Sequence, residues 1–245
     1  MNITETLCIA SFFAAIFVFG EKLHIGYQTH KRRALSAAGG VAVAYVFIHL
    51  LPEMARAGTE FVKITDDRSL LLPEHRIYIA ALAGFVLFYG LEHMTRWSRL
   101  SGRCEQAGYG ISDPIFLLHI GGFALYTGIV SYLMVRGIDE KSVPILLYGI
   151  AMGLHFFSVD LSMHNEHGSM YDNFGKWILA GTVLVGWSCG VLAELPKTVV
   201  ITMLGLVSGG VVMNSMIVEL PGEKNGRFLP FCAGAAAYAA LLFFI

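Results

Sequence analysis

Residues 153–167, GLHFFSVDLSMHNEH, place three histidines and two carboxylates in a chain that is 56% hydrophobic and only 14% charged. Imidazole and carboxylate groups together suit zinc, iron or manganese. Asp160, His164 and His167 are spaced i, i+4, i+7 and would share one face of a helix. His155 lies about 140° from Asp160 around an ideal helix, so a kink or widened turn near residues 157–158 would be needed to bring it to the same cavity.

The composition indicates a membrane protein. Soluble domains average about 25% charged residues, well above the share in this chain. Apolar runs recur along the sequence at roughly the 17–25 residues needed to cross the hydrocarbon core of a bilayer. The net charge of −1 gives no indication of nucleic-acid binding. The four cysteines are scattered, so neither a disulfide framework nor a thiolate metal site is expected.

We predict an all-α integral membrane protein with a single transmembrane domain over residues 1–245. Asp113-Pro114 and Ser142-Val143-Pro144 are typical helix starts, and Pro52, Pro196 and Pro221 are expected to follow or end helices. The predicted spans are 3–20, 36–52, 76–93, 113–135, 143–163, 176–193, 198–219 and 228–244.

The distribution of lysine and arginine favours both termini outside. With that orientation, the loops before residues 36, 113, 176 and 228 face the cytoplasm. These loops carry Lys22, Lys31, Arg32, Arg33, Arg96, Arg99, Arg103, Lys176, Lys224 and Arg227. The smaller remainder of the 17 basic residues falls on the opposite side.

Several polar residues of different spans fall at one depth in this arrangement. His155 lies about 12 Å from the inner end of its span, and His119 about 9 Å from the same face. Asp160 is closer to the cytoplasm, and Asn214 has a depth comparable with that of His119. Ionisable groups in lipid normally face a partner or a cavity, so this set is a candidate cation site. The pairs Glu92-His93 and His49/Glu53 end their spans, where side chains reach the headgroups without further function.

The chain resembles the ZIP family of divalent metal transporters. Residues 39–54, GGVAVAYVFIHLLPEM, are similar to the family's GxxLxxxFxHLLPE pattern. The stretch SGGVVMNSMIVELPGEKNGRFLPFCAGAAAYAALLF is similar to its seventh and eighth helices. The resemblance implies eight transmembrane helices in a ZIP-like bundle with both termini outside.

The metal motifs of that family are only partly present. HIGGFALYTG keeps His119 of the HNxxD motif, but Ile120 and Phe123 replace its asparagine and acidic residue. HFFSVD keeps the first histidine and the final acidic residue of HEIPHE, as His155 and Asp160. The resemblance therefore implies one reduced mononuclear site in place of a binuclear one. The candidate metal ligands are His119, His155, Asp160, Asn214 and His164.

We expect this protein to transport a divalent cation, zinc before iron or manganese, through that reduced His/Asp site. The alternative is a transport-inactive ZIP-like protein that acts as a regulatory or assembly partner, or that moves another solute or protons. The expected partners are the lipid bilayer and the cation, and a homodimer is compatible with both hypotheses. The expected location is a bacterial inner (cytoplasmic) membrane.

Two other classes of function are less well supported by the residues. An intramembrane zinc hydrolase would need a general base beside the metal, and the nearest carboxylates, Glu166 and Asp172, are expected in the cytoplasmic loop. We therefore expect no enzyme activity. Haem ligation by His119 and His155 would suit their similar depth. No cofactor other than the divalent ion is expected.

Overall fold

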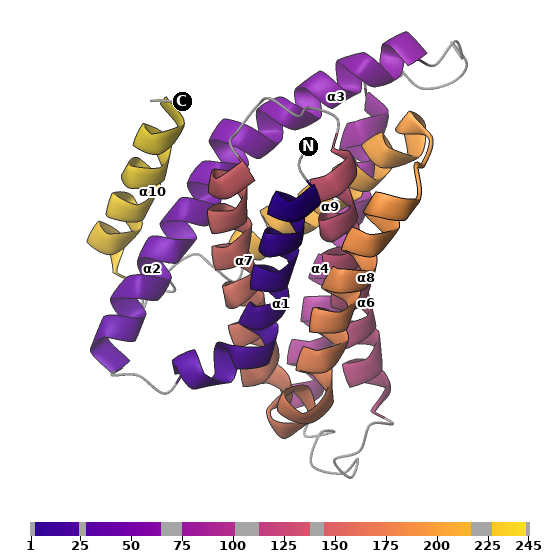
Figure 1. The fold of residues 1–245 in the computed structure, drawn as a ribbon. Coiled ribbons are helices and arrows are strands. Elements are labelled where there is room, and N and C mark those ends of the chain that lie inside the picture. The colour runs from indigo at the N-terminus through magenta and orange to yellow at the C-terminus, as the bar shows by residue number, and fades with distance from the viewer. Residues whose placement is uncertain are drawn as a thin grey trace.

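The described part of the chain is all-helical (Figure 1). The computed structural model describes residues 3–24, 28–64, 75–100, 113–137, 145–216 and 227–243. Its elements are α1 (Ile3–His24), α2 (Gln28–Tyr45), the π-helical turn η1 (Val46–Leu50), α3 (Leu51–Ile64), α4 (Arg76–Leu100), α6 (Pro114–Arg136), α7 (Ile145–His167), the π-helical turn η3 (Tyr171–Gly175), α8 (Lys176–Leu192), α9 (Lys197–Asn214) and α10 (Phe228–Phe243).

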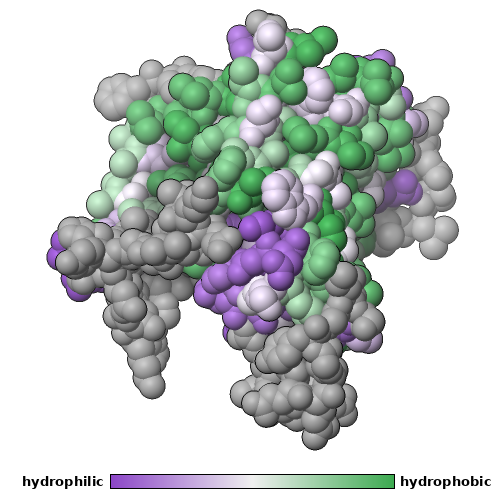
Figure 2. Space-filling view, turned by 60° about the horizontal axis from the view of Figure 1, so that its bottom comes forward, coloured by the Kyte–Doolittle hydropathy of each residue, from purple (hydrophilic) through white to green (hydrophobic). Residues whose placement is uncertain are grey.

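Seven of the described helical segments are long and apolar enough to cross a bilayer. The apolar part of α10, Phe228–Leu242, is shorter. Large apolar side chains such as Leu82, Leu125 and Leu146 are more than half exposed, and hydrophobic residues cover much of the surface in Figure 2. A water-soluble bundle would place such residues in its core, so the prediction of an all-α membrane protein is confirmed.

The helices pack mainly in pairs. The helix α4 lies along α9, α6 along α8 and α2 along α10, while α1 packs against both α7 and α8. The start of α1 and the end of α10 lie at the same end of the bundle, the upper end in Figure 1. The ends of α4 and α7 and the start of α6 lie at the opposite end. This lower end contains the residues considered below.

Two sequence signals set the ends of the helices around that region. The Asp113 carboxylate accepts a hydrogen bond from the Ile115 N–H at 3.0 Å, and Pro114 is the first helical residue, which confirms the predicted start of α6. The end of α7 is set by Gly168, whose φ of +52° ends the α-helix in the left-handed region. The predicted start at residues 142–144 and the predicted helix end at Pro221 lie outside the described residues.

The second predicted span does not end at Pro52, and this prediction was wrong. The helix continues through α3 to Ile64, with the π-helical turn η1 immediately before the proline. In that turn the Leu51 N–H donates to the Val46 carbonyl five residues earlier. A wider turn relieves the clash between a proline ring and the preceding carbonyls, so the chain passes through without breaking. No widened turn occurs at residues 157–158, because α7 is α-helical throughout.

Glycines allow the closest helix contacts in the bundle. A Cβ atom at Gly209 of α9 would overlap the Ala81 carbonyl oxygen of α4. At Gly40 of α2 it would overlap the Phe231 carbonyl oxygen of α10. Gly121 is different, because nothing lies within 4 Å of the position of its Cβ. The α4–α9 and α2–α10 contacts therefore require glycine, whereas Gly121 has room for a side chain.

We expect Gly209→Ala to destabilise the protein by about 1–3 kcal/mol, because the new methyl group must displace the backbone of α4. Gly121→Ala is the matched control and should be neutral or slightly stabilising, since alanine favours a helix over glycine. Thermal unfolding of both variants in detergent, followed by near-UV circular dichroism, measures the difference. Equal melting temperatures would contradict the packing described here.

Candidate metal centre

A cluster of two histidines and one glutamate joins α6 to the end of α7. His119 lies in the second turn of α6, and Glu166 and His167 are the last two residues of α7. One ligand atom from each of these three residues lies within 4.8 Å of the other two. Among the described residues, this is the one group of three histidine, cysteine or acidic side chains with that spacing.

The cluster depends on how far α7 extends. Buried side chains of α7 follow the helical period through Phe156, Val159 and Met163. The next positions of that inner face are residues 166 and 167, three and four residues after Met163. Because Gly168 ends the helix only after His167, both ligands remain in helical register and face α6. The Gly168 N–H bonds the His164 carbonyl at 2.9 Å and fixes this end.

The contacts of the cluster converge on Nδ1 of His119. The Nε2 atom of His167 lies 2.8 Å from it, so one imidazole donates a hydrogen bond to the other. The Oε2 atom of Glu166 is 3.4 Å away, and the Thr95 hydroxyl of α4 is 3.3 Å away. The Thr95 hydroxyl donates to the Leu91 carbonyl, so it offers His119 a lone pair. Two helices, α4 and α7, therefore direct polar atoms at one ring nitrogen of α6.

The opposite side of the His119 ring is apolar. His119 is 1% exposed, and Phe123 packs edge-on against its ring with centroids 5.2 Å apart. In the described part of the chain, His119 Nε2 has no hydrogen-bond partner. A proton on Nδ1 can be shared with His167, whereas a metal ion at Nδ1 would require the proton to be on Nε2. Metal binding at His119 would therefore break the hydrogen bond between the two imidazoles and leave the proton of His119 on Nε2.

The donor set is typical of a site for a divalent transition metal. Two imidazole nitrogens and a carboxylate oxygen suit zinc, iron or manganese, and three protein ligands leave a coordination position for water. Phe116 also packs against His167, with ring centroids 5.2 Å apart, so the site is apolar on two sides. These surroundings would strengthen the attraction between a bound cation and Glu166, because apolar walls lower the local dielectric.

The cluster lies beneath a hydrophilic part of the surface. Figure 2 shows a patch of hydrophilic side chains on the lower end of the bundle, bordered by hydrophobic surface and by residues drawn in grey. At this end of α7 and the start of α8, the polar residues that are at least partly exposed are His164, Asn165, Glu166, His167, Ser169, Asp172, Asn173 and Lys176. An ion at His119 is therefore one helical turn from polar surface.

The predicted ligands His155 and Asp160 do not join this group. His155 Nε2 lies 2.7 Å from the Tyr126 hydroxyl. The rings of Phe123 and Tyr126 lie between His119 and His155, in a series of contacts with centroids 5.2, 6.1 and 5.8 Å apart. The expected set of His119, His155 and Asp160 around one ion is therefore not formed, because aromatic side chains occupy the space between the histidines.

Asp160 is part of a different buried contact. It is 1% exposed, and its Oδ1 accepts a hydrogen bond of 2.5 Å from the hydroxyl of Tyr171 in η3. Its carboxylate lies directly against Gly20 of α1, where a Cβ atom would overlap it. This contact ties α7 to η3 and α1. It gives Asp160 a packing role that the sequence did not indicate.

The predicted ligand His164 also lies outside the cluster. Its Nδ1 pairs with Asp172 Oδ1 at 2.8 Å near the surface. Asn214 is buried at the end of α9. A role for His155, Asp160, His164 or Asn214 in binding a passing cation stays a prediction.

Glu166 was expected in the cytoplasmic loop, and neither Glu166 nor His167 was among the predicted metal ligands. The signal that could have identified both residues was the glycine at position 168. A glycine just after a histidine is a typical helix end, and it would have extended the predicted helix beyond residue 163. With that extension, the buried face of the helix predicts that Glu166 and His167 point inward.

No protein-family model matches the sequence, no curated protein is significantly similar to it, and no solved structure matches its fold. The geometry of the described residues is therefore the basis for any functional proposal.

We expect His119→Ala to weaken Co²⁺ binding by at least about 100-fold, because loss of even an outer-shell partner typically costs 10–100-fold in metal affinity. Isothermal titration of the purified protein measures this affinity. His93→Ala is the matched control, since His93 is exposed on α4 and stacks on Tyr89. Similar affinities for both variants would exclude His119 as a ligand.

We expect Tyr171→Phe to destabilise the protein by about 1–3 kcal/mol, because a buried carboxylate loses a hydrogen-bond donor. Tyr78→Phe removes a hydroxyl from an exposed position on α4 and should have little effect. Thermal unfolding in detergent compares the two variants. An unchanged melting temperature for Tyr171→Phe would mean that the Asp160 contact does not stabilise the bundle.

Proposed function

We propose that this chain is a membrane transporter of a divalent transition-metal ion, zinc before iron or manganese, and not an enzyme. The observation that carries the proposal is the convergence of His119, Glu166 and His167 from two membrane-spanning helices at one end of the bundle. Ionisable residues are costly within a membrane and normally mark an ion path or a site. A set of three protein ligands also leaves a coordination position open, through which a bound ion could exchange ligands.

The position of the cluster supports release on one side of the membrane. It lies at the lower end of the bundle, close to the hydrophilic patch of Figure 2. The distribution of basic residues in the sequence favours a cytoplasmic location for this end. With eight spans, counting the shorter α10, the termini would both lie outside. We propose this topology in a bacterial inner membrane, with the cluster as the inner station of the ion path.

A layer of aromatic side chains lies above the cluster. Phe88 contacts Phe123 and Tyr126 with ring centroids 5.3 and 5.2 Å apart. Tyr126 also contacts Phe156, with centroids 6.3 Å apart. Phe123 and Phe156 are at most 4% exposed. Transport would require these rings to separate, for example by movement of α6 against α7, so the described arrangement corresponds to a closed path.

The same layer favours a second candidate function. Phe123 and Phe156 occupy positions where the ZIP motifs have ligands, and they pack as core residues. A protein that keeps this layer closed would bind metal at the inner end without moving it across the membrane. It would then act as a metal-responsive regulatory or assembly partner, either alone or as a homodimer.

Metal uptake by proteoliposomes separates the two functions. We expect wild-type protein to admit Zn²⁺ to vesicles that contain a fluorescent zinc indicator, and the double variant His119→Ala/His167→Ala to reduce the initial rate at least about tenfold, because two of three ligands are lost. His93→Ala is the control and should transport at the wild-type rate.

The outcome of this experiment assigns one function or the other. Wild-type protein that binds metal but gives no uptake above empty vesicles would support the metal-responsive partner. Uptake that the double variant leaves unchanged would mean that the ion takes another path.

A further inference from the structure

The segment HLLPE (49–53) forms a second polar pair far from the cluster at His119. His49 belongs to the π-helical turn η1, and Glu53 lies in the first turn of α3. Their side chains meet with Nε2 and Oε2 3.1 Å apart. Both are largely shielded, with side-chain exposures of 8% and 16%. The expectation that this pair reaches the headgroups is therefore wrong, because the helix continues past Pro52 to Ile64.

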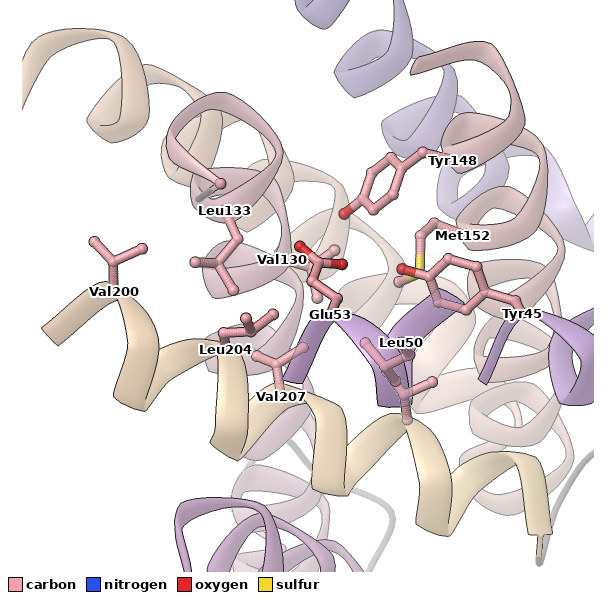
Figure 3. Close-up of a pocket in the computed structure, with 12 residues that line it drawn as sticks. Tyr45, Leu50, Glu53, Val130, Leu133, Tyr148, Met152, Val200, Leu204 and Val207 are labelled. Atoms are coloured by element: carbon pink, nitrogen blue, oxygen red, sulfur yellow. The ribbon is translucent and has the colours of Figure 1, made fainter. Parts of the chain in front are cut away.

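Glu53 faces an internal cavity of about 60 Å³. Figure 3 shows its carboxylate near the centre of the cavity, with the hydroxyls of Tyr45 and Tyr148 directed toward the same space. The other labelled lining residues are apolar: Leu50, Val130, Leu133, Met152, Val200, Leu204 and Val207. A carboxylate among such residues is costly unless it is paired with a positive charge or a proton. The cavity has space for a few water molecules, and Glu53 is the one acidic residue among the described residues that line it. These two features favour a small cation.

The cavity adjoins a cleft at the outer end of the bundle. This cleft, of about 230 Å³, shares the lining residues Gly137 and Val200 with the cavity. It also contains four charged side chains, which form the ion pairs Arg136–Glu194 and Lys197–Glu60 at 3.5 and 3.3 Å. The Glu53 cavity therefore lies next to a polar, water-accessible cleft.

The cavity and the inner cluster lie at different levels of the bundle. Val130 and Leu133, which line the cavity, are 11 and 14 residues after His119 on α6. At 1.5 Å per residue this separates the two levels by roughly 17–21 Å. Tyr126 and its neighbours in the aromatic layer lie between them on the same helix. The two polar sites are therefore on opposite sides of the closed layer.

We propose that His49 and Glu53 form an outer binding site for a divalent transition-metal ion. Zinc binds nitrogen and carboxylate oxygen at about 2.0–2.2 Å, and two such ligands around a tetrahedral ion lie about 3.3 Å apart. The observed separation of 3.1 Å between Nε2 and Oε2 fits that spacing. Water in the cavity completes the coordination, and the Tyr45 and Tyr148 hydroxyls can hydrogen-bond that water.

The ligands also select the class of ion. Imidazole favours zinc and its neighbours over calcium and magnesium, which prefer oxygen ligands alone. The Met152 sulfur, visible near the Tyr45 hydroxyl in Figure 3, adds a soft atom to the lining. Two protein ligands should hold the ion more weakly than the three at His119. The inference rests on the proposed function in one respect, which is that the His49/Glu53 site would be where ions enter the transport path that leads to His119.

Cobalt binding tests the outer site separately from transport. The His119→Ala/His167→Ala variant lacks two of the three inner ligands, so Co²⁺ binding at any remaining site can be observed alone. We expect it to bind one Co²⁺ ion per chain, seen as d–d absorption and by isothermal titration. Adding Glu53→Gln should weaken this binding at least about tenfold, since one of two protein ligands is lost.

Two further variants make the result specific. His49→Gln on the same background should also weaken Co²⁺ binding, and it keeps a polar side chain in the turn. Glu60→Gln, in the outer cleft, is the control and should not change the affinity. Near-UV circular dichroism and size-exclusion chromatography establish that each variant is folded. If Glu53→Gln does not fold, the comparison of His49→Gln with Glu60→Gln decides.

The outcomes distinguish this inference from the proposed function. Absence of Co²⁺ binding in the His119→Ala/His167→Ala variant, or binding that Glu53→Gln and His49→Gln leave unchanged, would overturn the outer site. Zn²⁺ uptake by wild-type vesicles would still be measured independently. Conversely, a protein that binds Co²⁺ through Glu53 but gives no uptake would keep the outer site and lose the transport proposal.

Discussion

The contact between the imidazoles of His119 and His167 links α6 to α7 at the end of the bundle where water is close. Lipid provides no hydrogen bonds to these rings, so a histidine in a membrane-spanning helix needs a partner within the protein. At 2.8 Å the two rings satisfy one another, and Glu166 and Thr95 complete the polar surroundings of the same nitrogen. The contact depends on Gly168, which ends α7 only after His167 and so keeps His167 in helical register with the buried face.

The rest of the interior divides its polar groups among separate contacts. His155 meets Tyr126, Asp160 meets Tyr171, and His49 meets Glu53. Aromatic rings separate the first of these contacts from the inner cluster. A continuous wet channel would link these groups through water. In the described arrangement each of these groups has a partner within the protein, and a group could exchange its partner when the helices move.

The sequence predicted the spans well and the site only in part. Apolar run length gave the approximate positions of the spanning helices, and Asp113-Pro114 gave the start of α6, because both signals are local. His119 was identified from its depth in a span. Its partners were not, because the extent of α7 depends on one residue, Gly168, and because Phe123 and Tyr126 of α6 fill the space toward His155 on α7. Which side chains fill a space between helices is a property of the packing and not of either helix alone.

The predicted end of the second span at Pro52 was wrong for a different reason. Proline usually ends a helix, but a preceding turn with a hydrogen bond to the fifth residue gives its ring room. The residues that form this turn, Val46–Leu50, look like an ordinary apolar stretch in the sequence. As a result, a pair expected at the lipid headgroups lies inside the bundle, with Glu53 on the wall of a cavity.

A π-helical turn contains one residue more than the α-helical turn it replaces, so η1 takes up an extra residue within a single turn. Removing one residue from Val46–Leu50 would let the segment close into a regular α-helix, and α3 would keep nearly the same orientation relative to α2, because one turn is completed in either case. The carboxylate of Glu53 would still face its cavity, but the ring of Pro52 would lose the room that the wider turn gives it. In this part of the chain the extra residue accommodates the proline without changing which groups face the interior.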